Sequence, residues 1–157
     1  MMPRDSDTLD NLYKKIILDH CKSPRNRADL SALSDDDMHE NPSCGDTLKL
    51  EILIGEDGRI ESARFDGHGC AISTASASLM TERLPGKTPG EARLFSGTVL
   101  RVLHGELPPS RLDEWGDLAA LGGVVPFPLR IKCASLAWHA LEKTLERYPE
   151  RRDASGQ

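Results

Sequence analysis

The sequence predicts an α+β fold in which helices pack on one face of a small antiparallel sheet. Residues 48–54 alternate apolar and polar side chains, and a turn then leads into a second extended run at 59–65, as in a β-hairpin. The other periodic segments are helical, and most of them follow the strands along the chain. This order favours separate helical and sheet layers. The 157 residues suit one domain over 1–157, with its core at about 9–147.

The first half of the chain is expected to contain one helix and two strands. Apolar residues recur at helical spacing over 9–21, and the segment SPRN at 23–26 is a typical helix stop. The polar stretch 22–43 contains three consecutive aspartates and is expected to be a solvated loop. In the first strand, leucine and isoleucine occupy one face, and Lys49 and Glu51 are expected on the opposite, polar face.

The second half is expected to be largely helical. The run of small residues at 70–80 predicts a helix that packs close to its neighbours, because serine and threonine are mediocre helix formers and packing must hold it. Glycines and prolines between 108 and 128 predict mixed turns around a short helix. Further helices are expected at 89–104, 115–121 and 133–147, and the charged tail 150–157 is expected to be disordered.

Composition and charge exclude several classes of protein. Hydrophobic residues make up 38% and charged residues 29%, which is typical of a soluble globular domain. The formal net charge of -5 argues against nucleic acid as a partner. No window is apolar enough to cross a membrane, and the N-terminal residues lack the apolar core of a secretory signal, so a cytoplasmic location is expected. In that reducing compartment, four cysteines indicate metal ligands or reactive thiols.

Three short segments together offer a four-ligand metal site. They are NPSCGD at 41–46, GHGC at 67–70 and RIKC at 130–133. The ligands are Cys44, Asp46, Cys70 and Cys133, and three thiolates with one carboxylate suit tetrahedral zinc. The glycine between Cys44 and Asp46 permits a turn that aims both side chains at one ion. Cys70 and Cys133 are each expected where a helix begins, and the partial positive charge there favours thiolate.

The long spacing between these segments leaves other interpretations open. Any one of the cysteines could be a small core residue, because cysteine is among the most buried residue types. Asp46 could instead be a turn former or a cap. Cys21 ends the first helix outside every ligand segment and is expected to pack in the core or to be an inert thiol. On spacing alone, a shared metal site and separate structural roles are equally supported.

Five stretches of the chain resemble the SufU family, within the wider group of IscU-like sulfur-handling proteins. They lie at 12–20, 23–26, 41–46, 67–80 and 127–141. The combination of NPxCGD, GxGCAIS and RIKC is far more specific than any one of these motifs. The resemblance covers nearly all of residues 9–145 and implies a single SufU-like α+β domain.

This resemblance implies a zinc-dependent sulfurtransferase that acts as a persulfide acceptor. It implies zinc bound by Cys44, Asp46, Cys70 and Cys133, and sulfur accepted from a SufS-type cysteine desulfurase during iron–sulfur cluster assembly. Cys44 matches the sulfur acceptor of the family, and Arg130 matches an arginine that supports transfer, so these two are the expected catalytic residues. A downstream sulfur acceptor or cluster scaffold would be the next partner.

Two other functions are compatible with the same ligands. The thiolates could hold an iron–sulfur cluster, which would make the chain a non-enzymatic scaffold of the IscU type. A closed four-ligand zinc site could also be purely structural, in an adaptor protein. The chain departs from IscU-like scaffolds at Lys132, where those proteins usually carry histidine, and at 126–130, where they carry an LPPVK segment.

Overall fold

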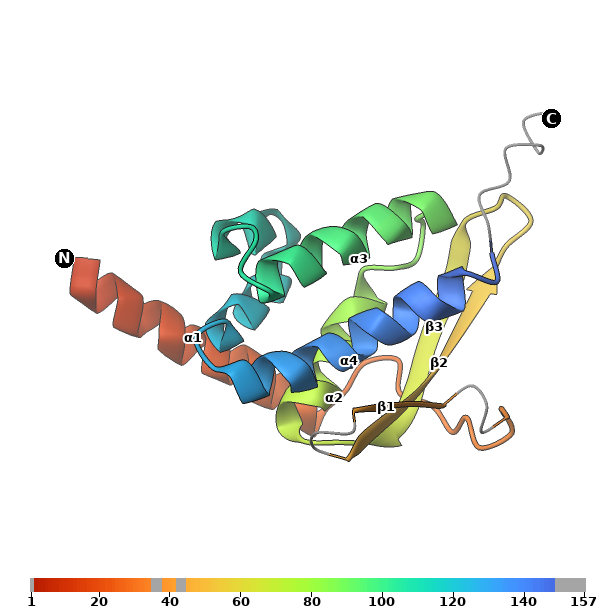
Figure 1. Ribbon diagram of the computed structural model, residues 1–157, viewed down its shortest axis with the longest axis horizontal. Coiled ribbons are helices and arrows are strands. Elements are labelled where there is room, and N and C mark those ends of the chain that lie inside the picture. The colour runs from red at the N-terminus through yellow and green to blue at the C-terminus, as the bar shows by residue number, and fades with distance from the viewer. Residues whose placement is uncertain (1, 35–37, 42–44, 149–157) are drawn as a thin grey trace.

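The computed structural model describes residues 2–34, 38–41 and 45–148 of the chain, and it has the expected α+β fold. Three antiparallel strands form one sheet in the order β1-β2-β3, and the helices pack over one of its faces (Figure 1). In chain order the elements are α1 (Met2–Lys22), β1 (Met38–Asn41), β2 (Asp46–Ile54), β3 (Ile60–His68), α2 (Ala71–Glu82), α3 (Pro89–Leu103), the 3-10 helical segment η2 (Pro109–Val124) and α4 (Pro128–Leu145).

The hairpin of β2 and β3 is the structural centre of the sheet. Leu48, Leu50 and Ile52 alternate along β2, and all three are buried against the helices, as the period of two predicts. The register pairs Leu50 with Phe65, and it pairs Thr47 with His68 at the far end of the hairpin. This register brings the start of β2 beside the junction between β3 and α2, where the site described below lies.

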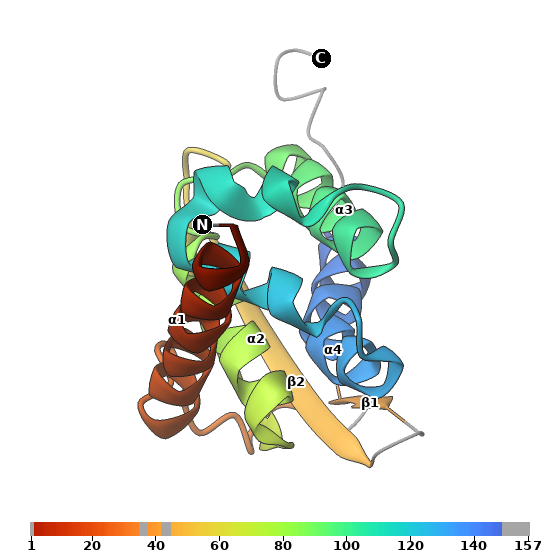
Figure 2. The same ribbon diagram turned by 90° about the vertical axis from the view of Figure 1, so that its left-hand side faces the viewer.

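Helix α2 is central to the helical layer. It lies between α1 and α4 in Figure 2 and contacts both of them as well as β3. Its buried residues are mostly alanine and serine, as the run of small residues predicts, and Leu79, Met80 and Thr81 are buried toward its C-terminal end. Ser76 donates to the carbonyl of Ala134 at 2.6 Å and accepts from the indole Nε1 of Trp138 at 2.9 Å. Among the described residues, no helix combines the length and apolar character that a bilayer-crossing segment needs.

Two helix starts and one strand differ most from the sequence-based expectations. Helix α1 begins at Met2 rather than at residue 9, and α4 begins at Pro128 rather than at Cys133. Proline is well suited to the first position of a helix, since it has no amide hydrogen to leave unpaired. Strand β1 lies in the stretch that was expected to be a loop. Its four residues pair with β2 from Met38–Lys49 to Asn41–Asp46, and so short a strand shows no sequence periodicity.

Two further expectations were wrong in detail. Lys49 does not face solvent, because the segment after α1 passes over this face of the sheet. Its side chain is only 9% exposed, and its Nζ donates to the carbonyl of Leu33 at 2.9 Å. The expected short helix at 115–121 is part of the longer η2, which contains a kink at Trp115 and Gly116.

A buried histidine links α1 to α2. His20 is 2% exposed, its Nδ1 lies 2.7 Å from Ser78 Oγ, and its Nε2 lies 3.8 Å from Glu82 Oε1. Burial lowers the pKa of His20 below its usual value of 6.5, and the nearby Arg25 guanidinium lowers this pKa further.

Lower pH is therefore expected to destabilise the fold through His20. The unfolded chain binds this proton at a higher pH than the folded chain, so the free energy of unfolding falls as pH drops through about 6.5. Urea unfolding between about pH 7.5 and 5.5 measures the effect. His20→Gln should show a shallower pH dependence than the parent, and His139→Gln, which changes an exposed histidine, should not. Equal slopes for the parent and His20→Gln would contradict this role.

Candidate metal centre

Asp46 is placed by the start of β2 and Cys70 by the end of β3, and these two strand ends lie side by side because Thr47 pairs with His68. Asp46 is the first residue of β2 and is 7% exposed. Gly45 before it has φ of 76°, a left-handed conformation that favours glycine, as the turn predicted from the sequence requires. Cys70 follows β3 and is the N-cap residue of α2. Its position at a helix N-terminus, expected from the sequence, is confirmed.

Cys133 is placed by α4, at a different position from the one expected. Because the helix begins at Pro128, Cys133 lies in its second turn and is half-buried, so it gains no N-terminal amide groups of its own. The helix nevertheless turns its thiol toward the N-terminus of α2. Three elements that are distant in sequence therefore deliver Asp46, Cys70 and Cys133 to one place.

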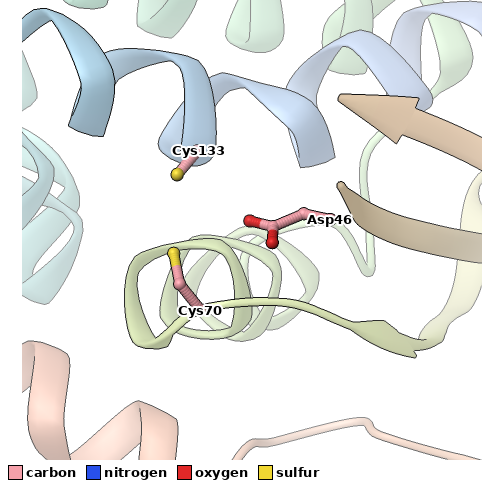
Figure 3. Close-up of side chains that lie close together, drawn as sticks. All are labelled: Asp46, Cys70 and Cys133. Atoms are coloured by element: carbon pink, nitrogen blue, oxygen red, sulfur yellow. The ribbon is translucent and has the colours of Figure 1, made fainter. Parts of the chain in front are cut away.

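The donor atoms of these three residues are close enough to share one ion. The two Sγ atoms and a carboxylate oxygen all lie within 4.8 Å of one another, and the side chains point toward one another in Figure 3. Sulfur and oxygen donors on a tetrahedral zinc ion lie about 3.5–3.8 Å apart, given bond lengths of about 2.0–2.3 Å. Small side-chain rotations would close the difference. Two sulfurs and one carboxylate oxygen also fit zinc chemically.

The fourth expected ligand, Cys44, lies outside the described residues. It stands two positions before Asp46 in the sequence. Cys21, on α1, does not belong to the group of converging donor atoms and is half-buried, in keeping with the structural role expected for it.

Arg130 lies on the exposed first turn of α4, three residues before Cys133. Its guanidinium is stacked over the ring of Phe127, with Cζ 4.5 Å from the ring centroid. Such a cation–π contact at an exposed site is worth about 0.5–1 kcal/mol, which is weak enough for the side chain to move. A positive charge thus lies on the same helix end as the Cys133 thiol.

Ser73 is a residue of this centre that the sequence analysis missed. It is 6% exposed, and its hydroxyl donates to Asp46 Oδ2 in a short hydrogen bond. The same oxygen lies 3.2 Å from the carbonyl oxygen of Cys133 and 3.7 Å from Cys70 Sγ. Helical periodicity could have identified it, because Ser73 is three residues after Cys70 and so lies on the same face of α2.

Comparison with known proteins shows the family of the chain. The chain matches the NifU-like N terminal domain family over residues 12–155. The chain belongs to this family. It is 44% identical over 135 residues to the zinc-dependent sulfurtransferase SufU of Bacillus subtilis (strain 168), covering 86% of this chain and 90% of that protein. It is 38% identical over 139 residues to the iron-sulfur cluster assembly scaffold protein IscU of Streptococcus pyogenes serotype M1, covering 88% and 86%.

Two solved structures share the fold of this chain. A crystal structure of a hypothetical protein has a TM-score of 0.74 and 36% identity, and the match covers 88% of this chain and 99% of that one. A candidate iron-sulfur cluster assembly scaffold protein for the SUF system from Fervidobacterium islandicum AW-1 has a TM-score of 0.69 and 30% identity, over 83% and 93% of the two chains. The resemblance to the SufU family seen in the sequence is thereby confirmed.

Proposed function

We propose that this chain is a zinc-dependent sulfurtransferase that accepts persulfide sulfur from a SufS-type cysteine desulfurase for iron–sulfur cluster assembly. The observation that supports it most is the convergence of Asp46, Cys70 and Cys133 within 4.8 Å, in a chain that is 44% identical to a SufU. Zinc is held by these three residues together with Cys44. A cytoplasmic location follows, because thiolates stay reduced there.

The transfer step needs only thiol chemistry. The Cys44 thiolate attacks the outer sulfur of the persulfide on the desulfurase. A new S–S bond forms on Cys44 while the S–S bond of the desulfurase persulfide breaks, and its electron pair leaves on the desulfurase cysteine as a thiolate. No external oxidant or reductant is consumed. Zinc, when bound, favours the thiolate form of its cysteine ligands at neutral pH.

Arg130 has an electrostatic role in this proposal. Three thiolates and a carboxylate carry more negative charge than a divalent ion cancels, and a guanidinium cannot itself coordinate zinc. In this proposal the guanidinium of Arg130 stabilises the anion that forms at the Cys44 persulfide. Sulfur would then pass to a downstream acceptor or cluster scaffold.

Arg130→Ala is therefore expected to keep its zinc and to transfer sulfur about 10–100-fold more slowly, which corresponds to the loss of a charge-assisted hydrogen bond worth about 1.5–3 kcal/mol. Arg130→Lys should recover only part of the rate, because an ammonium lacks the planar two-donor geometry. Arg101→Ala is the matched control, since Arg101 is an exposed arginine of α3 that pairs with Glu106. Zinc content and transfer rate are measured on the same preparations. A parental rate for Arg130→Ala would leave Arg130 as an ordinary surface residue.

A scaffold of the IscU type is the second candidate function, since the chain is also 38% identical to an IscU scaffold. The same thiolates could bind a cluster, because thiolate suits both zinc and iron–sulfur clusters. Elemental analysis and absorption spectra of anaerobically purified protein separate the two. Colourless protein with one zinc per chain supports the sulfurtransferase. Brown protein that contains iron and sulfide supports the scaffold.

A further inference from the structure

The Ser73 side chain approaches all three converging donor residues. It lies one turn into α2, beyond the N-cap residue Cys70. Its Oγ donates to Asp46, lies 3.7 Å from the Cys70 sulfur, and lies 3.2 Å from the backbone carbonyl of Cys133. A single hydroxyl therefore connects β2, α2 and α4 at the candidate metal centre.

The hydroxyl has only one proton to donate, and two oxygens, Asp46 Oδ2 and the Cys133 carbonyl, are within its reach. A hydrogen bond to an ionised carboxylate is the stronger of the two. The proton therefore belongs to the bond with Asp46. This bond fixes the rotation about the Cβ–Cγ bond of Asp46. It thereby fixes the direction in which the carboxylate oxygens face the two sulfurs.

Gly69 limits the space around this pair. A Cβ at Gly69 would lie 3.0 Å from Ser73 Cβ and 3.2 Å from Asp46 Cγ, closer than side chains normally pack. The backbone of the β3–α2 junction thus lies directly against the Asp46–Ser73 pair. The carboxylate thus accepts a hydrogen bond from Ser73 and is packed closely against the Gly69 backbone.

The other two serines buried on α2 differ from Ser73. Ser76 bonds to Trp138 and to the Ala134 carbonyl, and Ser78 bonds to His20 and to the amide of Arg25. Their hydrogen bonds join helices within the core. The hydrogen bond of Ser73 instead goes to a candidate metal ligand.

We propose that Ser73 is a positioning residue of the metal centre, which holds the Asp46 carboxylate in the orientation that ligates the ion. This inference rests on the zinc site proposed above. A hydrogen-bonded partner behind a ligand pre-orients it, and loss of such a partner typically costs about 10–100-fold in metal affinity. Ser73 should therefore tighten zinc binding and slow zinc release.

The test compares Ser73→Ala with Ser76→Ala. Both variants lose one buried hydroxyl from the same helix. Alanine is a better helix former than serine, so neither substitution lowers the helix propensity of α2. Zinc affinity is measured by competition with a chromophoric chelator. Ser73→Ala should bind zinc about 10–100-fold more weakly than the parent. Ser76→Ala should lower the melting temperature but retain parental zinc affinity. Parental affinity in Ser73→Ala would overturn the proposal.

Two further measurements separate positioning from general stability. In an Asp46→Ala background, Ser73→Ala should have no further effect on zinc affinity, because there is no carboxylate left to orient. Cobalt(II) substituted into Ser73→Ala should show a visible ligand-field spectrum shifted from that of the parent. An undiminished loss of affinity in the Asp46→Ala background, or an unchanged cobalt spectrum, would contradict the positioning role. If the parent protein binds no zinc, the zinc site proposed above is refuted, and not only the role of Ser73.

Discussion

Replacement of Cys44 by alanine is expected to abolish stimulation of the cysteine desulfurase and to return sulfide release to its basal rate. The reason is chemical, because Cys44 carries the only thiol of the Cys-Gly-Asp turn and is the residue that matches the family acceptor. Without a nucleophilic thiolate at this position, the outer sulfur of the desulfurase persulfide cannot be transferred to this chain. Sulfide release from cysteine plus a thiol reductant measures the effect.

Cys21→Ala is the matched control for this prediction. Cys21 is a half-buried thiol on α1 and does not belong to the converging group, so its removal should leave stimulation at the parental level. The zinc content of the Cys44 variant should be determined in the same experiment, since Asp46, Cys70 and Cys133 remain available to hold the ion. Full stimulation by Cys44→Ala would rule out Cys44 as the acceptor.

Removal of zinc is expected to lower the melting temperature by about 10 °C. A ligand present at about 1,000 times its dissociation constant stabilises the folded state by about 4 kcal/mol. Each kcal/mol corresponds to about 2–4 °C in a domain of this size. Loss of the ion also leaves the thiolates and the carboxylate of Asp46, which is 7% exposed, to repel one another. Differential scanning calorimetry before and after chelation measures the shift.

Zinc added back to the chelated protein should restore the original melting temperature, whereas magnesium, which prefers oxygen ligands, should not. Cys70→Ser provides a variant with a weakened ligand set, and its melting temperature should respond less to chelation. An unchanged melting curve after verified zinc removal would show that the ion does not support the fold.

Much of this fold could be predicted because its periodic segments are long. Leu48, Leu50 and Ile52 alternate along β2 and are all buried, and the small residues of α2 predicted its close packing. The three ligand segments predicted a shared site, and the structure brings Asp46, Cys70 and Cys133 together. Long-range convergence of this kind depends on the tertiary fold. From the sequence alone, only the resemblance to the SufU family favoured one shared site over separate roles for these residues.

The missed features depend on tertiary contacts that the sequence pattern does not encode. Strand β1 has four residues and is held by pairing with β2, which no local period reveals. Lys49 alternates with leucine along β2, which suggested that its side chain faces solvent. The segment that contains Leu33 covers it instead. Helix α4 starts at Pro128, where proline was interpreted as a turn residue instead of a helix start. Ser73 resembles the other small residues of α2 until its contact with Asp46 is seen.

Intact-mass analysis of the zinc-loaded protein after a single turnover with the desulfurase and cysteine tests the central claim most directly. The account predicts a gain of one sulfur atom, located on Cys44 by peptide mapping, with zinc still bound to the same preparation. The added sulfur should be removed by a thiol reductant. Protein that retains zinc and stimulates the desulfurase but never carries the extra sulfur on Cys44 would contradict the account.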